Sequence, residues 1–380
     1  PPDPRSIFGT MKMMTPRTEA ELAEMVAGAA QPLRIIGGGT RSVAVQAGEM
    51  LTTSGLSGIT LYEPGSLTLV AQAGTPLDEI EAALAAEKQR LAFEPMDHRT
   101  LLGTTGTPTI GGVFAANVSG PRRIQVGAAR DFLLGVRFVD GTGRILKNGG
   151  RVMKNVTGYD LVKLMAGSKG QLGVISEVAF KVLPLPEVTA TLVLRGMDDA
   201  AAVEAMAQAL GSPFEVSGAA HWPGQGTFLR IEGFAGSVAY RTEKLRGMLG
   251  GEIEQSAQRW AEIRDVAPFH GAEGDIWRLS VKPSDAPGIV ARAGAEAVLY
   301  EWGGGLVWLR MAPGTDLRAR IAPFQGHATL LRADADALAR LPVEQPEAPA
   351  LAVLSAGLRA KFDPRGIFAA GGKAHQVAAS

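Results

Sequence analysis

The feature that most restricts the fold is a run of three glycines directly after a short, mostly apolar segment. Residues 33–36 predict a strand, and Gly37-Gly38-Gly39 follow without a spacer. Consecutive glycines free several backbone N–H groups to point at an anion, because no Cβ blocks its approach. Ser42 stands where the dinucleotide fingerprint needs a glycine, and no helical pattern follows it. The sequence therefore disfavours a standard NAD Rossmann site and leaves two alternatives, another kind of anion cradle or a simple tight turn.

A second loop carries the same signal with hydroxyl groups added. Residues 104–112 read Thr-Thr-Gly-Thr-Pro-Thr-Ile-Gly-Gly, and residues 115–120 read Ala-Ala-Asn-Val-Ser-Gly. Small residues allow close contact with a flat, polar ligand, and hydroxyls donate to phosphates or ring carbonyls. One such loop could be packing, but two in one domain favour a ligand site. A third segment, residues 167–176, is by itself only a glycine-rich turn before a strand.

Charge and cysteine usage exclude several other functions. The 38 basic and 38 acidic residues give no net charge, which argues against a nucleic-acid binder. The chain has no Cys, so thiolate-ligated iron–sulfur clusters, disulfides, cysteinyl-flavin links and thiol catalysis are excluded. Electrons leaving this chain must therefore pass to another molecule or subunit. No apolar run reaches the roughly 18 residues of a membrane span.

The order of predicted elements divides the chain into two units. We expect residues 1–14 to be a leader or loose arm. A capping box at Thr18 predicts a helix to about residue 30, a strand is expected at 67–73, and Thr75 is expected to cap a helix running to about 88. A hairpin (134–139 with 144–147), a short helix (160–165) and two strands (173–176 and 179–183) follow. Pro184 and Pro186 mark a boundary.

The second unit, residues 187–345, alternates between strand and helix patterns. The clearest are a strand at 189–194, a helix at 198–210, a strand at 227–231 and a helix at 237–248. This alternation indicates an antiparallel sheet with helices on one face. A linker rich in Pro and Glu, residues 342–349, precedes a last helix at 350–361.

Taken together, these segments resemble the vanillyl-alcohol-oxidase-like family with a PCMH-type FAD-binding fold. The matching pieces are the triple glycine, Thr-Ile-Gly-Gly, Gly158-Tyr159-Asp160, the Gly-Ser-x-Gly-x-Leu-Gly-Val-Ile segment and the Phe-Asp-Pro-x-Gly at 362–366. Within this family the chain is similar to the FAD-binding E subunits of bacterial glycolate oxidases. That similarity rests on Phe93-Glu94-Pro95, on Gly120-Pro121-Arg122-Arg123 and on residues 152–161.

The resemblance implies an α+β fold with a two-part PCMH-type FAD-binding domain at 15–184, a smaller α+β cap at 187–345 and a C-terminal return at 346–380. It implies FAD as the cofactor, with Asn155 and Asp160 structural. Covalent relatives attach flavin through a His near the first loop, and none is present there, so the FAD is expected to be non-covalent. The implied FAD-binding residues are Gly37, Gly38, Gly39, Thr40, Arg41, Ser42, Pro95, Thr105, Gly106, Thr107, Thr109, Gly111, Gly112, Asn117, Ser119, Gly120, Val174 and Ile175.

The residues that would perform chemistry are not evident from the sequence. The five histidines, among them His98 and His221, are scattered without ligand spacing, so no metal site is expected. Arg122 and Arg123 suit either an acidic ligand or a solvated basic pair, and Trp302 before three glycines suggests a strand bend and not a site. No base stands out in the cap, while Arg230, Arg278 or Arg310 could bind an anion.

The resemblance also implies a function, with two alternatives left open. The favoured function is an FAD-bearing redox subunit of a glycolate oxidase or dehydrogenase that converts glycolate to glyoxylate. It would act beside a catalytic flavin subunit and an iron–sulfur subunit, in the cytoplasm or peripherally at the inner membrane. The alternatives are a self-sufficient dehydrogenase of a small 2-hydroxy acid, and an assembly subunit that holds FAD without turnover.

Overall fold

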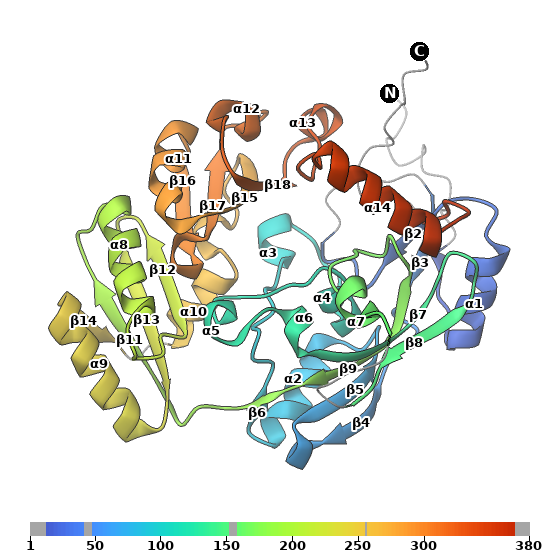
Figure 1. Ribbon diagram of the computed structural model, residues 1–380, viewed down its shortest axis with the longest axis horizontal. Coiled ribbons are helices and arrows are strands. Elements are labelled where there is room, and N and C mark those ends of the chain that lie inside the picture. Colours follow the sequence, from blue (N-terminus) through green and yellow to red (C-terminus); the bar gives the residue numbers. More distant parts are fainter. Residues whose placement is uncertain (1–12, 42–47, 152–157, 255–256, 369–380) are drawn as a thin grey trace.

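The computed structural model describes residues 13–41, 48–151, 158–254 and 257–368 (Figure 1). A small three-stranded parallel sheet, in the order β1-β3-β2, begins the FAD domain. The last described residues return to it, because the Leu33 N–H donates to the Ile367 carbonyl at 2.6 Å. Ile367 and Phe368 bury their side chains in the same small core as Leu22 and Leu51. The elements are β1 (Met13–Met14), α1 (Glu19–Gly28), β2 (Leu33–Ile36) and β3 (Glu49–Thr52).

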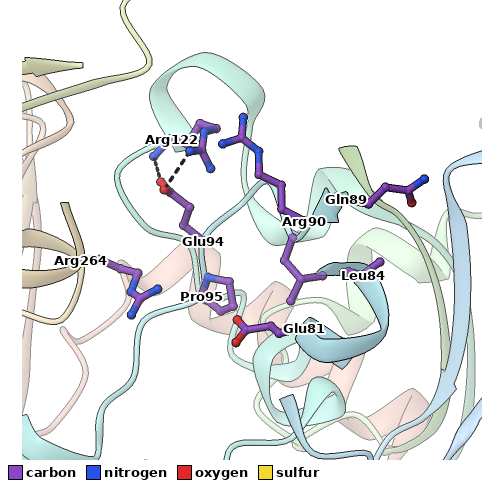
Figure 2. Close-up of a pocket in the computed structure, with 9 residues that line it drawn as sticks. Glu81, Leu84, Gln89, Arg90, Glu94, Pro95, Arg122 and Arg264 are labelled. Atoms are coloured by element: carbon purple, nitrogen blue, oxygen red, sulfur yellow. Dashed lines mark hydrogen bonds and ion pairs between the residues drawn. The ribbon is translucent and has the colours of Figure 1, made fainter. Parts of the chain in front are cut away.

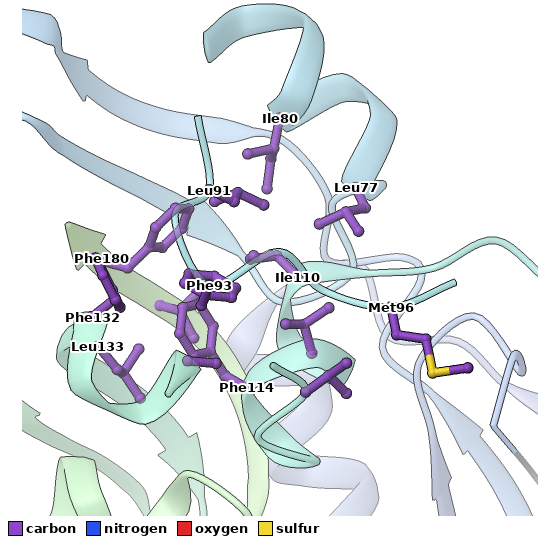
Figure 3. Close-up of a cluster of buried hydrophobic side chains, with 14 of the residues drawn as sticks. Leu77, Ile80, Leu91, Phe93, Met96, Ile110, Phe114, Phe132, Leu133 and Phe180 are labelled. Carbon is purple, nitrogen blue, oxygen red and sulfur yellow. The ribbon is translucent and has the colours of Figure 1, made fainter. Parts of the chain in front are cut away.

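A five-stranded antiparallel sheet in the order β4-β5-β9-β7-β8 forms the second part of this domain. Its core is built on phenylalanines (Figure 3): the ring centroids of Phe93 and Phe114 are 5.5 Å apart, and those of Phe114 and Phe180 are 5.3 Å apart. The strands are β4 (Ile59–Glu63), β5 (Thr68–Gln72), β7 (Leu133–Val139), β8 (Ile145–Gly149) and β9 (Val174–Lys181), with β6 (Gln89–Arg90) and β10 (Leu183–Pro184) paired beside them. The helices are α2 (Leu77–Ala86), α3 (Arg99–Leu102), α4 (Ile110–Ala115), α5 (Arg123–Val126), α6 (Ala129–Phe132) and α7 (Leu161–Met165).

The cap is an antiparallel sheet of eight strands in the order β14-β11-β13-β12-β16-β17-β15-β18. Successive side chains of a strand face opposite sides of the sheet, and here each side packs against a different part of the protein. Trp277 and Leu309 pack with the helices of the cap, whereas Ile276 and Trp308 pack with the core of the FAD domain. The strands are β11 (Val188–Leu194), β12 (Gly218–Trp222), β13 (Gly226–Gly233), β14 (Glu252–Glu254), β15 (Asp275–Val281), β16 (Ala297–Glu301), β17 (Leu306–Met311) and β18 (Gly326–Arg332). The helices are α8 (Asp199–Leu210), α9 (Ala235–Leu249), α10 (Ala257–Arg264), α11 (Ala286–Ala293), α12 (Leu317–Ile321) and α13 (Ala335–Arg340).

The fold class and most long elements agree with the sequence predictions. Thr18 caps α1 as expected, because its hydroxyl accepts the Glu21 N–H at 3.1 Å. The predicted helix after Thr75 forms, but Pro76 is its N-cap and the Thr75 hydroxyl accepts the Gly58 N–H instead. The prediction of two strands at 173–176 and 179–183 is wrong, since β9 runs unbroken between β5 and β7. The short helices α3 and α4 had no periodic signal, because they are only 4 and 6 residues long.

The chain leaves the cap through one long helix, α14 (Pro349–Phe362), which runs back over the FAD domain (Figure 1). None of its residues is buried, and four large apolar side chains are exposed, including Val353 at 72% and Leu354 at 65%. No helix in the described part of the chain is long and apolar enough to serve as a membrane span.

Candidate functional site

The two predicted glycine loops lie against each other and are held by direct hydrogen bonds. The Thr107 N–H donates to the Gly38 carbonyl at 3.1 Å, and the Thr104 hydroxyl donates to the Thr40 carbonyl at 3.0 Å. A Cβ added to Gly38 would lie 1.5 Å from the Thr107 carbonyl oxygen, and one added to Gly106 would lie 1.7 Å from the Gly38 carbonyl oxygen. These glycines are therefore required by loop-to-loop contact, a reason that the sequence did not indicate.

Three more glycines are also closely packed, two between the loops and one against the end of β5. A Cβ on Gly37 would lie 2.5 Å from the Thr109 hydroxyl, one on Gly111 would lie 2.5 Å from the Ala73 methyl, and one on Gly112 would lie 2.8 Å from the Arg41 guanidinium. Gly39 differs, since its φ of +76° favours glycine and a Cβ there would meet open space.

The open side of this loop pair has the groups that a dinucleotide requires. Thr105 and Thr107 are exposed, and Arg41 places a guanidinium beside Gly112. Burial lowers the pKa of Arg41 to about 10, so it is a cation at neutral pH. Hydroxyls, accessible glycine backbone and a partly buried cation suit a pyrophosphate. These residues fit FAD, with Gly39, Arg41, Thr105 and Thr107 as the groups that would hold its phosphates; Ser42 lies outside the described residues.

The remaining predicted FAD-binding residues differ in how accessible their side chains are. Pro95 is buried, and Val174 and Ile175 are buried at the start of β9. The Asn117 side chain accepts the Arg130 N–H and the Ser119 hydroxyl accepts the Ala129 N–H, both at 2.9 Å. These two side chains stabilise α6. Only their backbone groups and the hydrogen-bonding positions that remain on the side chains are therefore available to a ligand.

A buried ionic network joins the FAD domain to the cap. Arg122 lies within 2.6 Å of Glu232 on β13, and Arg230 binds Glu94 through two hydrogen bonds of 2.8 Å. Arg90 also reaches Glu232, at 2.8 Å. Burial alone would raise the pKa of Glu232, but the hydrogen bonds and charges of Arg122, Arg230 and Arg90 hold it well below its ordinary value. The prediction of Arg122 as a ligand or solvated residue is therefore wrong, and Arg230 is not available as an anion site.

A cavity of about 320 Å³ lies beside this network (Figure 2). Arg90, Arg122 and Glu94 contribute to its wall from the network, and Arg264 and Glu81 face it from α10 and α2. Arg264 is itself paired with Asp265 at 2.7 Å. Most of the charged groups in the wall of this cavity are therefore already paired within the protein.

A second polar group of residues lies on the side of the cap sheet that faces the FAD domain. Arg278 on β15 is opposite Trp308 on β17, and its guanidinium lies 5.9 Å from the centre of that ring and 5.2 Å from the centre of Trp302. Arg123, from α5 of the FAD domain, lies 4.5 Å from the centre of the same Trp302 ring. Trp302 is thus part of a domain contact, in addition to the predicted strand bend.

Glu301 is buried next to this group at 2% exposure. The Trp308 indole N–H donates to one of its carboxyl oxygens at 3.3 Å, and the other oxygen is buried without a hydrogen-bond partner. Burial raises the pKa of Glu301 to about 8, although Trp308 and the charge of Arg278 oppose the rise. At neutral pH this carboxyl is mainly protonated, which makes it a titratable group at the domain junction that the sequence did not reveal.

The charges of Arg41 in the FAD cradle and Arg278 in the cap both act on His98. Its Nδ1 lies 3.2 Å from the Met96 carbonyl and donates to it. Burial lowers the pKa of His98 to about 3, and the charges of Arg41 and Arg278 lower it further. The FAD cradle and the cap residues therefore act on the same neutral imidazole.

Comparison with known proteins agrees with this geometry. Residues 12–149 match the family model described as an FAD binding domain. The chain is 39% identical over 313 residues to glycolate oxidase subunit GlcE of Escherichia coli, covering 82% of this chain and 83% of that protein. It is 29% identical over 224 residues to glycolate oxidase subunit GlcD of Bacillus subtilis, covering 58% of this chain and 43% of that protein.

The fold also matches solved structures. Alkyldihydroxyacetonephosphate synthase superposes with a TM-score of 0.68 at 16% identity, covering 96% of this chain and 78% of the other. At that identity the match concerns the fold alone. The GlcE match, which spans most of both chains, defines the family: this chain belongs to the GlcE family of glycolate oxidase subunits, which are FAD-binding oxidoreductases.

Proposed function

We propose that the chain is the FAD-bearing redox subunit of a glycolate oxidase that converts glycolate to glyoxylate, acting beside a catalytic flavin subunit and an iron–sulfur subunit. The observation that carries the proposal is the pair of interlocked glycine loops, in which Gly39 faces open space, Arg41 lies beside Gly112, and Thr105 and Thr107 are exposed. FAD bound there would accept a hydride or electrons. The chain's own residues bind its phosphates, exclude water at the domain junction and hold the cap in place. The other predicted FAD-binding residues, together with non-covalent attachment, form part of this proposal.

The partners are inferred from the relatives and from the composition. Relatives of this chain are named as two different subunits of glycolate oxidase, GlcE and GlcD, so we infer a multi-subunit complex. With no Cys in the chain, an iron–sulfur cluster with thiolate ligands would belong to a partner. We infer a cytoplasmic location, with any membrane attachment made through the partners.

The exposed face of α14 is the surface that we assign to the partner flavin subunit. Its outward residues are apolar or small over three turns, with Leu351, Leu354 and Leu358 spaced i, i+3 and i+7. Among described residues the face carries no charged side chain before Arg359. Exposed apolar patches of this kind mark interaction surfaces.

Introducing charge on this face should separate the subunits without unfolding the chain. We expect Leu351→Glu with Leu354→Glu to reduce co-purification with a tagged GlcD-type subunit at least tenfold, because burial of each of these exposed leucines would contribute about 1.5–3 kcal/mol to association. Met248→Glu, at an exposed apolar position on α9, is the matched control. Unchanged co-purification, or binding of the free chain to lipid vesicles that the double variant loses, would contradict this assignment.

A second candidate function is a self-sufficient dehydrogenase of a small 2-hydroxy acid. One observation favours it: Arg278 and Glu301 supply a cation and a titratable carboxyl on the side of the cap that faces the FAD domain. Against it, Glu301 is mainly protonated at neutral pH and is thus poorly prepared to accept a proton.

Anaerobic mixing with glycolate separates the two functions. We expect the purified chain to be yellow, to release its flavin into the supernatant on acid precipitation, and to be bleached by millimolar glycolate slowly or not at all until partner subunits are added. Flavin absorbance in a stopped-flow instrument gives the rate. Rapid bleaching of the chain alone would establish the self-sufficient dehydrogenase, and flavin that stays with the precipitate would show a covalent link.

A further inference from the structure

The side of the cap sheet facing the FAD domain carries several charged residues, and most of them have partners. Arg230 and Glu232 belong to the network with Glu94 and Arg122. Arg310 lies 2.9 Å from Glu296 and donates to the Glu273 carbonyl. Each of these charged groups therefore has a partner within the protein.

Arg278 and Glu301 are different. Within the described part of the chain, no carboxylate lies within ion-pair distance of Arg278, which is half-buried with its guanidinium over the faces of Trp302 and Trp308. Glu301 has one oxygen bound to Trp308 and one buried oxygen without a donor. A second guanidinium, Arg123, faces the same Trp302 ring. A buried polar atom without a partner is costly, so the Glu301 oxygen beside a half-buried guanidinium that has no ion pair is typical of a ligand site.

We propose that Arg278 and Glu301 form a binding site for a small carboxylate, in which the Arg278 guanidinium binds the carboxylate and the Glu301 carboxyl donates a hydrogen bond to the ligand. Trp302 and Trp308 form an apolar wall that excludes water and strengthens both interactions. Arg123 adds positive charge from the FAD domain, so the site is completed only when the cap is seated. The inference rests on the proposed function only for the choice of a two-carbon acid as ligand.

The protonation state of Glu301 gives the site a distinctive property. The charged groups that act on it are Arg278 on β15 and Arg230 on β13, each two strands away in the sheet, and Glu94 in the FAD domain. Its pKa of about 8 keeps it neutral at pH 6.5, where it can donate to a carboxylate. Above pH 8 it becomes an anion, which repels the ligand and can no longer donate. Affinity for a carboxylate should therefore fall as the pH rises through 8, while His98 stays neutral throughout this range.

The test is calorimetric titration of the FAD-loaded chain with oxalate, which cannot be oxidised by hydride loss and so reports binding alone. We expect Arg278→Met to weaken oxalate binding roughly 10- to 100-fold, as expected for loss of a charged hydrogen-bonding partner. Arg310→Met, on the same side of the sheet, is the matched control and should change affinity less than about threefold. Glu301→Gln keeps a donor, so it should bind oxalate nearly normally at pH 6.5 and retain this affinity at pH 9, where the wild type loses most of it.

Two results would overturn the proposal: equal oxalate affinity in wild type and Arg278→Met, or the same loss of affinity at pH 9 in wild type and Glu301→Gln. Inorganic phosphate that binds as tightly as oxalate would also overturn it, since it would indicate a general anion site. The FAD content of each variant is measured alongside. Wild type that retains FAD but binds no oxalate would mean failure of this inference alone, whereas wild type that holds no FAD would mean failure of the proposed function.

Discussion

Replacing Gly38 with valine is expected to leave the purified chain with less than about a tenth of its normal FAD. The added Cβ would lie 1.5 Å from the Thr107 carbonyl oxygen and 2.6 Å from the carbonyl carbon, so backbone must move. Overpacking of this kind costs about 1–3 kcal/mol, and about 1.4 kcal/mol is a tenfold change in affinity. The displaced segment is the one that carries Gly39 and Arg41, so the open side of the cradle changes shape. The measurement is the ratio of flavin to protein absorbance after gel filtration.

The matched control is Gly65→Val, in the same domain. A Cβ there meets nothing within 4 Å and its φ is ordinary, so the general cost of replacing a glycine by valine is retained without the collision. Circular dichroism of both variants separates a local change from unfolding. Normal FAD content in Gly38→Val, with the fold intact, would mean that the two loops do not hold the cofactor.

The glycine loops show what a sequence can predict about such a site. Each loop is short and continuous, so its residue types are visible together, and the family resemblance rests on these local runs. The α+β fold and the helices α1, α8 and α9 follow from local periodicity in the same way. The physical reason for a glycine at Gly38 could not be predicted from the sequence, because its nearest neighbour in the fold, Thr107, is far away in the chain.

The cap residues show why the rest could not be predicted. Glu301 looks like any strand-terminal glutamate until β16 and β17 pair and bring it to Trp308. Arg278, Arg230 and Arg310 were equivalent candidates in the sequence, and only their partners distinguish them. A weak signal did exist: with strand periodicity, Leu299 and Glu301 share a side, and a glutamate in that position of a buried strand is unusual.

The second large effect is expected at Glu232, because three arginines form ion pairs with it. Arg122 and Arg90 lie within 2.8 Å of it and Arg230 within 3.6 Å, and the side chains of Glu232 and Arg122 are 8% and 5% exposed. Glu232→Gln keeps the shape but leaves three cations with Glu94 as their remaining network carboxylate. Removing one partner of a buried ion pair typically costs about 3–5 kcal/mol, because the other charge stays buried without compensation. We expect a loss of this size at pH 7, and looser seating of the cap on the FAD domain.

The pH dependence of this loss has a defined sign. The folded-state pKa of Glu232 lies well below its unfolded value of about 4.3, so its contribution is fully present above that value and is lost as the pH falls below it. Wild type should therefore lose stability progressively as the pH falls below about 4.3, while Glu232→Gln should lose less over the same range, so the difference between the two curves should narrow with falling pH. Urea unfolding of the FAD-loaded chain, followed by flavin release and tryptophan fluorescence, measures both. Glu243→Gln, in an exposed pair with Arg246, is the control and should stay within about 0.5 kcal/mol of wild type. If Glu232→Gln matched that control at pH 7, the network would be dispensable and the cap would be held by its apolar contacts alone.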